Sequence, residues 1–184
     1  ASQLSVGYVD IKGSAGHNCL SYMGLHSTED DFPVALVGGD VGDSLGTNMR
    51  RGFVYCSGDA GSDVGKSMSG GTIVVGGSPG NRFGSEMDDS THPSILIAYR
   101  APRGYLPVER IRNGLMLLLN RDVDAPPRFL RFREGIEEVL PKAGIDVESQ
   151  YQAIRCYVEE WKEQHGPVWL PEPTAAVPVP ADEA

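Results

Sequence analysis

The sequence predicts a mainly β protein: a right-handed parallel β-helix of four to five coils, followed by a small α-helical extension and an extended tail. Three observations predict this fold class. A unit with glycine corners recurs four times, its last three copies are spaced by 19 residues, and apolar residues alternate along each unit. Periods of about 20 residues are typical of solenoids, in which copies of one supersecondary unit stack on each other.

Each unit contains two glycines three positions apart and a methionine seven positions after the second glycine. The glycine pairs are Gly13 and Gly16, Gly39 and Gly42, Gly58 and Gly61, and Gly77 and Gly80; the methionines are Met23, Met49, Met68 and Met87. The first unit stands 26 residues before the second because Gly24 to Asp31 adds a loop. A corner that recurs at one phase requires positive φ or close approach of neighbouring backbones, and glycine allows both.

Apolar residues alternate before each corner, which predicts short strands with one face turned inward. One column of equivalent positions holds Val9, Ala35, Val54 and Ile73, and the next but one holds Ile11, Val37, Cys56 and Val75. A circuit of 19 residues is too short for a crossover with a full helix, so the strands are expected to stack in parallel without helices. Cys19 and Cys56 occupy core columns and are predicted to be packing residues. Residues 95–99 form the last predicted strand, after an insertion at residues 88–93.

Helices are predicted after residue 100. Pro107 opens one with the apolar stripe Val108, Ile111, Leu115 and Leu118. A second, Pro127 to Leu140, carries Phe129, Phe132, Ile136 and Leu140, and a third starts at Asp146 and ends near Gly166 with Val147, Tyr151, Ile154, Val158 and Trp161. The predicted organisation is therefore a β-helix at 1–100, a helical extension at 101–166 that caps the solenoid or reaches a partner, and a flexible Pro- and Ala-rich tail at 167–184.

Composition argues against several classes of function. The 184 residues carry a net charge of −9, which argues against binding nucleic acid or an anionic membrane surface. No apolar run is long enough to span a bilayer, and the N-terminus does not read as a secretory signal. Three widely spaced cysteines without a CxxC motif predict a reduced, cytoplasmic protein.

Several motifs resemble chemical sites but fit the repeat better. Residues 60–67 match a loose phosphate-binding loop, yet the next residues predict a strand where that loop requires a helix. Asp40, Asp43, Asp59 and Asp63 are spaced unlike the aspartates of calcium-binding β-rolls and are expected to bond the local backbone. His17, His26, His92 and His165 are dispersed, so a polar surface role is predicted rather than a metal site. No catalytic, cofactor-binding or metal-binding residue is predicted in this chain.

Between Arg103 and Arg133 lie seven arginines against three acids. This excess is suited to an anionic cofactor or an acidic partner surface; the alternative is a set of solvated helix faces that pair with acids elsewhere. If the chain has an electrostatic docking feature, the expected residues are Arg128, Arg131 and Arg133.

The stretch Gly39-Asp-Val-Gly-Asp-Ser-Leu-Gly-Thr-Asn-Met49 and the two glycine-cornered units that follow it resemble the GXGXG β-helix domain over about residues 5–100. Glutamate synthase large subunits, N-methylglutamate synthase-type subunits, and one subunit each of formylmethanofuran dehydrogenase and of the bacterial formyltransferase/hydrolase complex share this domain. The run Met49-Arg-Arg-Gly, followed by a strand and Gly58-Asp-Ala-Gly, is most similar to the members from these last two complexes. The resemblance implies a domain that supports and spaces catalytic modules and performs no chemistry itself.

The leading hypothesis is therefore a non-catalytic structural subunit of a multisubunit cytoplasmic enzyme of one-carbon metabolism, resembling the GXGXG subunit of formylmethanofuran dehydrogenase and the formyltransferase/hydrolase complex. Its partners would be catalytic subunits that carry molybdenum or tungsten, zinc, or flavin and iron–sulfur clusters, with no cofactor in this chain. One alternative is the GXGXG subunit of a glutamate-synthase-like or N-methylglutamate-synthase-like complex. Another is a stand-alone enzyme or ligand-binding solenoid that uses the arginines and His92 as binders.

Overall fold

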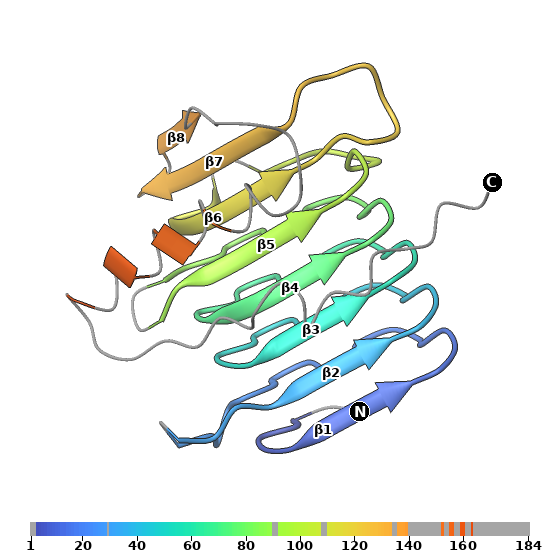
Figure 1. Cartoon of the computed structure of the whole chain (residues 1–184), viewed down its shortest axis with the longest axis vertical. Coiled ribbons are helices and arrows are strands. Elements are labelled where there is room, and N and C mark those ends of the chain that lie inside the picture. The colour runs from blue at the N-terminus through green and yellow to red at the C-terminus, as the bar shows by residue number, and fades with distance from the viewer. Residues whose placement is uncertain are drawn as a thin grey trace.

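A computed structural model describes residues 3–28, 30–89, 92–107, 110–133 and 136–139, together with Gln152, Arg155, Cys156, Glu159, Glu160 and Glu163. In these residues eight strands form one sheet whose spatial order follows the sequence (Figure 1). The strands are β1 Tyr8–Ile11, β2 Val34–Val37, β3 Phe53–Cys56, β4 Gly71–Val75, β5 Ser94–Ala98, β6 Asn113–Leu118, β7 Arg128–Arg133 and β8 Ile136–Val139.

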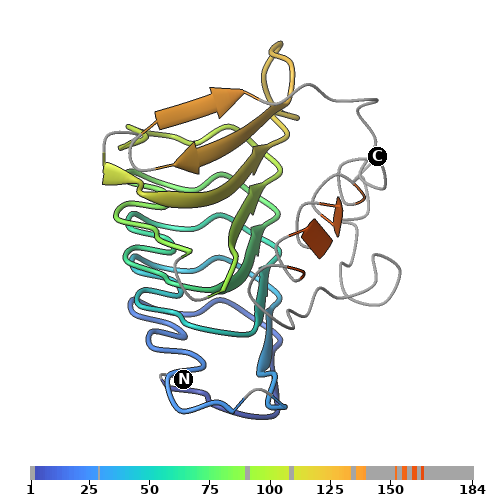
Figure 2. The same ribbon diagram turned by 90° about the vertical axis from the view of Figure 1, so that its left-hand side faces the viewer.

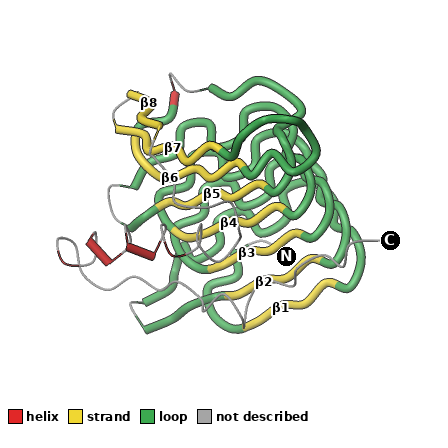
Figure 3. Tube along the Cα trace, turned by 45° about the horizontal axis from the view of Figure 1, so that its top comes forward, coloured by secondary structure: helices red, strands yellow, loops and turns green. Residues whose placement is uncertain are grey.

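Strands β1 to β6 are parallel, so the chain completes a circuit between each strand and the next. Figure 2 shows these circuits stacked, and Figure 3 shows the strands aligned along one wall while loops make the rest of each circuit. The predicted parallel β-solenoid is confirmed, with four turns from β1 to β5 and a further step to β6. The predicted columns are confirmed too, because Val9 pairs with Ala35, Ala35 with Val54, and Val54 with Ile73.

The solenoid interior holds the inward columns of the strands and the methionine column. Met23, Met49, Met68 and Met87 are fully buried, and Cys19 and Cys56 are buried beside them, as the repeat predicts. Burial raises the pKa of the Cys56 thiol to about 12, which leaves it protonated at neutral pH. Both cysteines therefore act as packing residues.

From β3 to β6 the opposite face of the sheet is also buried. Its outward side chains form a second apolar cluster in which none is more than 5% exposed: Phe53, Tyr55, Val74, Ile95, Ile97, Tyr99, Leu115, Leu117, Leu119 and Phe129. A parallel sheet buried on both faces reads as a continuous apolar run rather than as an alternating pattern. For this reason the sequence of residues 115–119 does not indicate a strand.

Two predicted helices are wrong. Residues 113–118 form β6, which extends the parallel stack beyond the strand predicted to be last, and residues 128–133 and 136–139 form β7 and β8. These two strands reverse direction and close the C-terminal end of the stack with antiparallel pairs. In the third predicted helix, the six described residues between Gln152 and Glu163 are helical. The rest of 146–166 and the tail 167–184 lie outside the described residues.

The corners repeat as regularly as the strands. In each corner, alternate residues have positive φ, in the sets 18, 20, 22; 44, 46, 48; 63, 65, 67; and 82, 84, 86. Leu20 adopts a φ of 57° where later corners use glycine. The repeat also reaches back to the first described residues, because Gly24 N–H donates to Leu4 O just as Arg50 N–H donates to Met23 O. Leu4 thus occupies the methionine column. A search for the repeated methionine misses this position because it holds leucine.

Candidate functional site: a basic notch between two loops

Two irregular loops leave the solenoid at the same phase of the repeat. The first loop begins at Gly24, directly after Met23, and the second begins at Asp88, directly after Met87. Between them, Arg50 follows Met49 and Ser69 follows Met68. Backbone hydrogen bonds of 2.9 Å join these positions, from Arg50 N to Met23 O and from Ser69 N to Met49 O. The two loops therefore lie on one edge of the solenoid, with two regular circuits between them.

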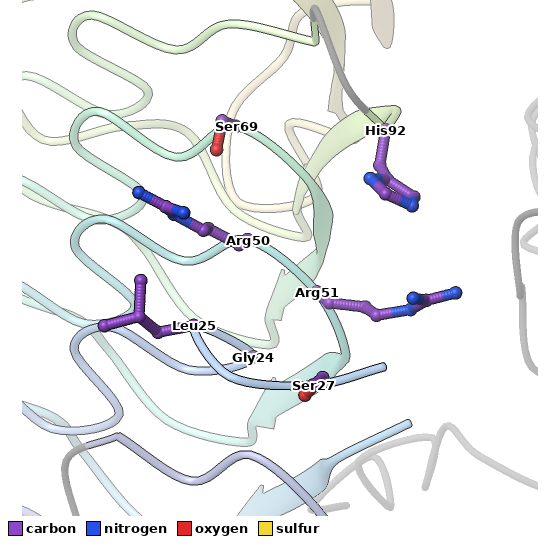
Figure 4. A pocket seen from close by; sticks show the side chains of 7 residues that line it. All are labelled: Gly24, Leu25, Ser27, Arg50, Arg51, Ser69 and His92. Atoms are coloured by element: carbon purple, nitrogen blue, oxygen red, sulfur yellow. The ribbon is translucent and has the colours of Figure 1, made fainter. Parts of the chain in front are cut away.

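A hollow of about 420 Å³ opens on this edge. We call it the notch; it is lined by Gly24, Leu25, Ser27, Arg50, Arg51, Ser69 and His92 (Figure 4). A second hollow of about 10 Å³ shares Arg51 and His92 with it and reaches Phe32 and Ile95 beside the sheet. The notch thus takes residues from the first loop, from the corners of two circuits and from the second loop.

Glycines allow the loops to lie close to the circuits. A Cβ on Gly24 would lie 2.6 Å from Arg51 O and 2.7 Å from Arg51 N, so only glycine lets the first loop pack on the next circuit. A Cβ on Gly70 would lie 2.8 Å from the Cβ of His92, so glycine here lets His92 lie against the third circuit. Any side chain at either position would push a wall of the notch outward.

The charged groups of the notch are held differently. Arg51 Nη1 donates to Thr28 O at 2.7 Å and so ties the first loop to the second circuit. Arg50 is exposed, and in the part of the chain that the structure describes its guanidinium makes no hydrogen bond or ion pair. Figure 4 shows Arg50 and Arg51 leaving the corner in opposite directions, with His92 on the side of Arg51.

The described carboxylates of the same loops are not among the residues that line the notch. The Thr28 amide and hydroxyl donate hydrogen bonds to the Asp31 carboxylate at 3.0 and 2.8 Å. These hydrogen bonds, chiefly the one from the amide, lower the pKa of Asp31. Asp88 and Asp89 begin the second loop, where both have interaction partners. The described lining combines two guanidiniums, an imidazole and two hydroxyls, and one of these hydroxyls, that of Ser27, donates to Ser5 O. The charge of Arg51 also contributes to the lowered pKa of Asp31.

The corner aspartates have a structural role that differs from the expected one. The sequence predicts that they bond the local backbone, but each bonds the next circuit: Asp40 Oδ1 accepts the Asp59 N–H at 2.8 Å, and Asp59 Oδ1 accepts the Ser78 N–H at 2.8 Å. Ser14 Oγ starts this ladder by accepting the Asp40 N–H at 3.1 Å. In a parallel ladder, His17 Nδ1 accepts the Asp43 N–H at 3.0 Å, which agrees with a polar surface role for His17.

After residues 60–67 the sequence predicts a strand, where a phosphate-binding loop requires a helix. Strand β4 follows Lys66, so this prediction is confirmed. Among the described residues, no group of three histidine, cysteine or acidic side chains could hold a metal ion. His92 is not expected near the first loop from its sequence position, yet it lines the notch together with Ser27 of that loop. The position of the two insertions in the repeat could have predicted this. Each insertion directly follows a residue of the methionine column, so both must lie on the same edge of the solenoid.

The predicted docking arginines lie on β7 rather than on a helix. Arg128 forms an ion pair with Glu137 of β8, and Arg131 lies opposite Glu138 in the strand register. Arg133 ends β7 and is exposed. Two of the three thus face acids of the neighbouring strand, and their docking role remains a prediction.

Comparisons with known proteins found no match: no family model, curated protein or solved structure matches this chain. Among the helical residues that the structure describes, none belongs to a helix long and apolar enough to cross a membrane.

Proposed function

We propose that this chain is a non-catalytic solenoid subunit of a multisubunit enzyme, with a role like that of the GXGXG subunit in the formylmethanofuran-handling complexes of one-carbon metabolism. The observation that supports this role best is the phase-locked stacking of the circuits. Side-chain acceptors bond the next circuit at equivalent corners, while strands β3 to β6 are buried on both faces of the sheet. A stack tied together in this way is stiff, which suits a part that fixes the spacing of catalytic subunits.

In this proposal the chain winds right-handed, as connections between parallel strands do in nearly all proteins. The complex is cytoplasmic, where its three free thiols stay reduced. The catalytic partners carry the cofactors: molybdenum or tungsten, or zinc, in a formylmethanofuran-type complex, and flavin with iron–sulfur clusters in a glutamate-synthase-like or N-methylglutamate-synthase-like complex.

Native purification of the tagged chain from its own cells tests the proposal. The expected result is a complex of defined stoichiometry whose partner subunits carry the activity, identified by mass spectrometry and by metal and flavin analysis. Molybdenum, tungsten or zinc subunits support the leading assignment, and flavin and iron–sulfur subunits support the alternative. A monomer that turns over substrate alone would overturn the supporting role.

The same purification tests the three arginines of β7. Replacing Arg128, Arg131 and Arg133 with alanine should reduce recovery of the partners, increasingly so at raised salt, because screening weakens what remains of an electrostatic contact. Recovery equal to that of the unmodified chain at every salt concentration would remove these residues from the interface.

A second candidate, a ligand-binding solenoid, is favoured by the notch and its cationic lining. It differs from the first in requiring no partner protein. A ligand that raises the melting temperature of the isolated chain, without any co-purifying protein, would support it.

A further inference from the structure

The outer face of the sheet, opposite the solenoid interior, becomes buried partway along the stack. Tyr8 of β1 is 59% exposed and Val34 of β2 is half-buried, whereas Phe53 of β3, next in the same column, is fully buried. The same column is still buried at Ile95 and Leu115. Val34 and Phe53 both have a strand on either side, so pairing within the sheet does not account for the difference. Other atoms must therefore lie over β3 to β6.

The covering atoms belong to the chain itself, because these side chains are buried within a single chain. The loops of the circuits do not supply them, since they lie on the opposite side of the strands (Figure 2). Figure 2 also shows helical residues between 152 and 163, in orange to red, on the outer side of the strands and at a height within the stack. Parallel strands that are buried on both faces are normally covered by helices.

The described helical residues lie on one face of a helix, because they follow each other at alternating intervals of three and one. Five of the six are exposed and Arg155 is half-buried; the exposed residues are Gln152, Cys156, Glu159, Glu160 and Glu163. Helical spacing assigns the opposite face to the apolar stripe predicted from the sequence, which is Val147, Tyr151, Ile154, Val158 and Trp161. A helix with its polar face in solvent turns such a stripe toward the protein.

We infer that residues 146–166 form an amphipathic helix that packs by this stripe on the outer face of the sheet from β3 to β6. The sizes agree, because Val147 to Trp161 spans about 21 Å of helix and the three steps from β3 to β6 span about 14 Å. The connection is long enough, since residues 140–151 separate the end of β8 from Gln152. This inference goes beyond the proposed function: a partner subunit would meet the chain's own helix on this side instead of the sheet.

The test introduces one thiol beneath the inferred helix. Val74→Cys, in a chain that also carries Cys156→Ser, places it in the outer cluster, between Tyr55 and Ile97 in the strand register. Tyr8→Cys in the same background is the exposed reference. A maleimide should modify the thiol at position 74 about a hundredfold more slowly than the thiol at position 8, because the former reacts only when its cover opens.

Paired substitutions in the helix identify the cover. Ile154→Ser with Val158→Ser should speed modification at position 74 about tenfold or more, since two aliphatic side chains are lost from the contact. Glu160→Ser with Glu163→Ser is the matched control, which introduces the same residue on the exposed face and should change the rate by no more than about twofold. The two native cysteines inside the solenoid are buried, so their lack of reaction shows that each variant remains folded.

Trp161 gives a second measurement that leaves the sheet unchanged. With Trp169→Phe it becomes the only tryptophan of the chain. Its fluorescence should be quenched by acrylamide several-fold less in the native chain than in urea, because the stripe is packed against the sheet only in the folded state.

Four results would overturn the inference. The first is a thiol at position 74 that reacts as fast as the one at position 8. The second is an equal rate of modification in the stripe pair and in the control pair. The third is equal quenching of Trp161 in the native and unfolded chain. The fourth is a truncation after Gly166 that exposes the thiol at position 74 as strongly as the stripe pair does, which would make the tail the cover. All four use the isolated chain, so they do not bear on the co-purification that tests the proposed function.

Discussion

Replacing glycine by alanine at two equivalent corners should give opposite results. A Cβ on Gly61 would lie 2.7 Å from Asp43 N and 2.8 Å from Gly42 C, which belong to the backbone of the preceding circuit. At Gly16, in the same column of the first circuit, a Cβ would meet nothing within 4 Å. Neither glycine has positive φ, so backbone strain does not separate the two sites.

The magnitude follows from the neighbours. Backbone cannot move aside as a flexible side chain can, so Gly61→Ala must separate two circuits and lengthen the bond from Gly61 N to Val41 O, now 3.0 Å. Overpacking of this kind costs about 1–3 kcal/mol, whereas alanine at an unhindered site with compatible φ stabilises by about 0.4–1 kcal/mol. The free energies of unfolding of the two variants should therefore differ by about 1.4–4 kcal/mol.

Urea and thermal unfolding, followed by circular dichroism, measure this difference. In a chain of this size 1 kcal/mol shifts the melting temperature by about 2–4 °C, so Gly61→Ala should melt several degrees below the unmodified chain and Gly16→Ala at or above it. Equal destabilisation by both substitutions would show that the corner glycines serve backbone conformation and not the approach of stacked circuits. A neutral Gly61→Ala would refute the stacking geometry itself.

Three further predictions follow from particular side chains. Asp59→Ala leaves the Ser78 N–H without its acceptor and should cost about 1–3 kcal/mol, while Asp59→Asn keeps an oxygen there and should cost less in the same urea assay. Both variants lose the ion pair of Asp59 Oδ2 with Arg103, so equal losses would exclude the ladder bond as the cause. The pKa of Asp63 is lowered below its ordinary value of 3.8, and the largest cause is the hydrogen bond from Arg82. Its carboxylate therefore stabilises the fold above that value, and the contribution disappears as the pH falls through the lowered pKa, so Asp63→Asn should flatten the acid limb of stability against pH; superimposable limbs would contradict this. Met68→Ala should cost about 2–5 kcal/mol because the side chain is fully buried, and Met68→Leu should cost less than about 1.5 kcal/mol; a loss below about 1 kcal/mol for alanine would show that the column collapses around the gap.

The repeat is predictable because one physical constraint acts at every copy. Residues in one column meet the same neighbours above and below, so alternation and corner glycines recur together, and the pairing of Ala35 with Val54 can be read from the 19-residue spacing. The end of the stack cannot be read in this way. Leu115 to Leu118 are buried on both faces of the sheet, which removes the alternation, and their spacing also matches a helix. In β7 the aromatic pair Phe129 and Phe132 faces opposite sides of the sheet, although a spacing of three suggests one helix face.

The candidate site is predictable only in part. Both loops are recognisable as insertions, and the sequence points to His92 and to arginines as binders, but the arginines it singles out lie after residue 100. Arg50 and Arg51 stand out only as part of the Met49-Arg-Arg-Gly run. They lie near His92 because the two loops leave the repeat at equivalent positions. A scan for local motifs does not compare the positions of distant loops within the repeat.

Because the circuits stack at a fixed spacing, the number of repeat units sets the length of the solenoid along its axis. Neighbouring strands lie about 4.8 Å apart, so the five steps from β1 to β6 set a rise of about 24 Å along the axis. Gain or loss of one whole 19-residue unit would change that rise by a single step and leave the side chains of every other unit facing as before. Insertions of arbitrary length are instead accommodated at the edge where Gly24 and Asp88 begin, outside the measured axis. Distance along the axis and the chemistry of that edge can therefore change independently.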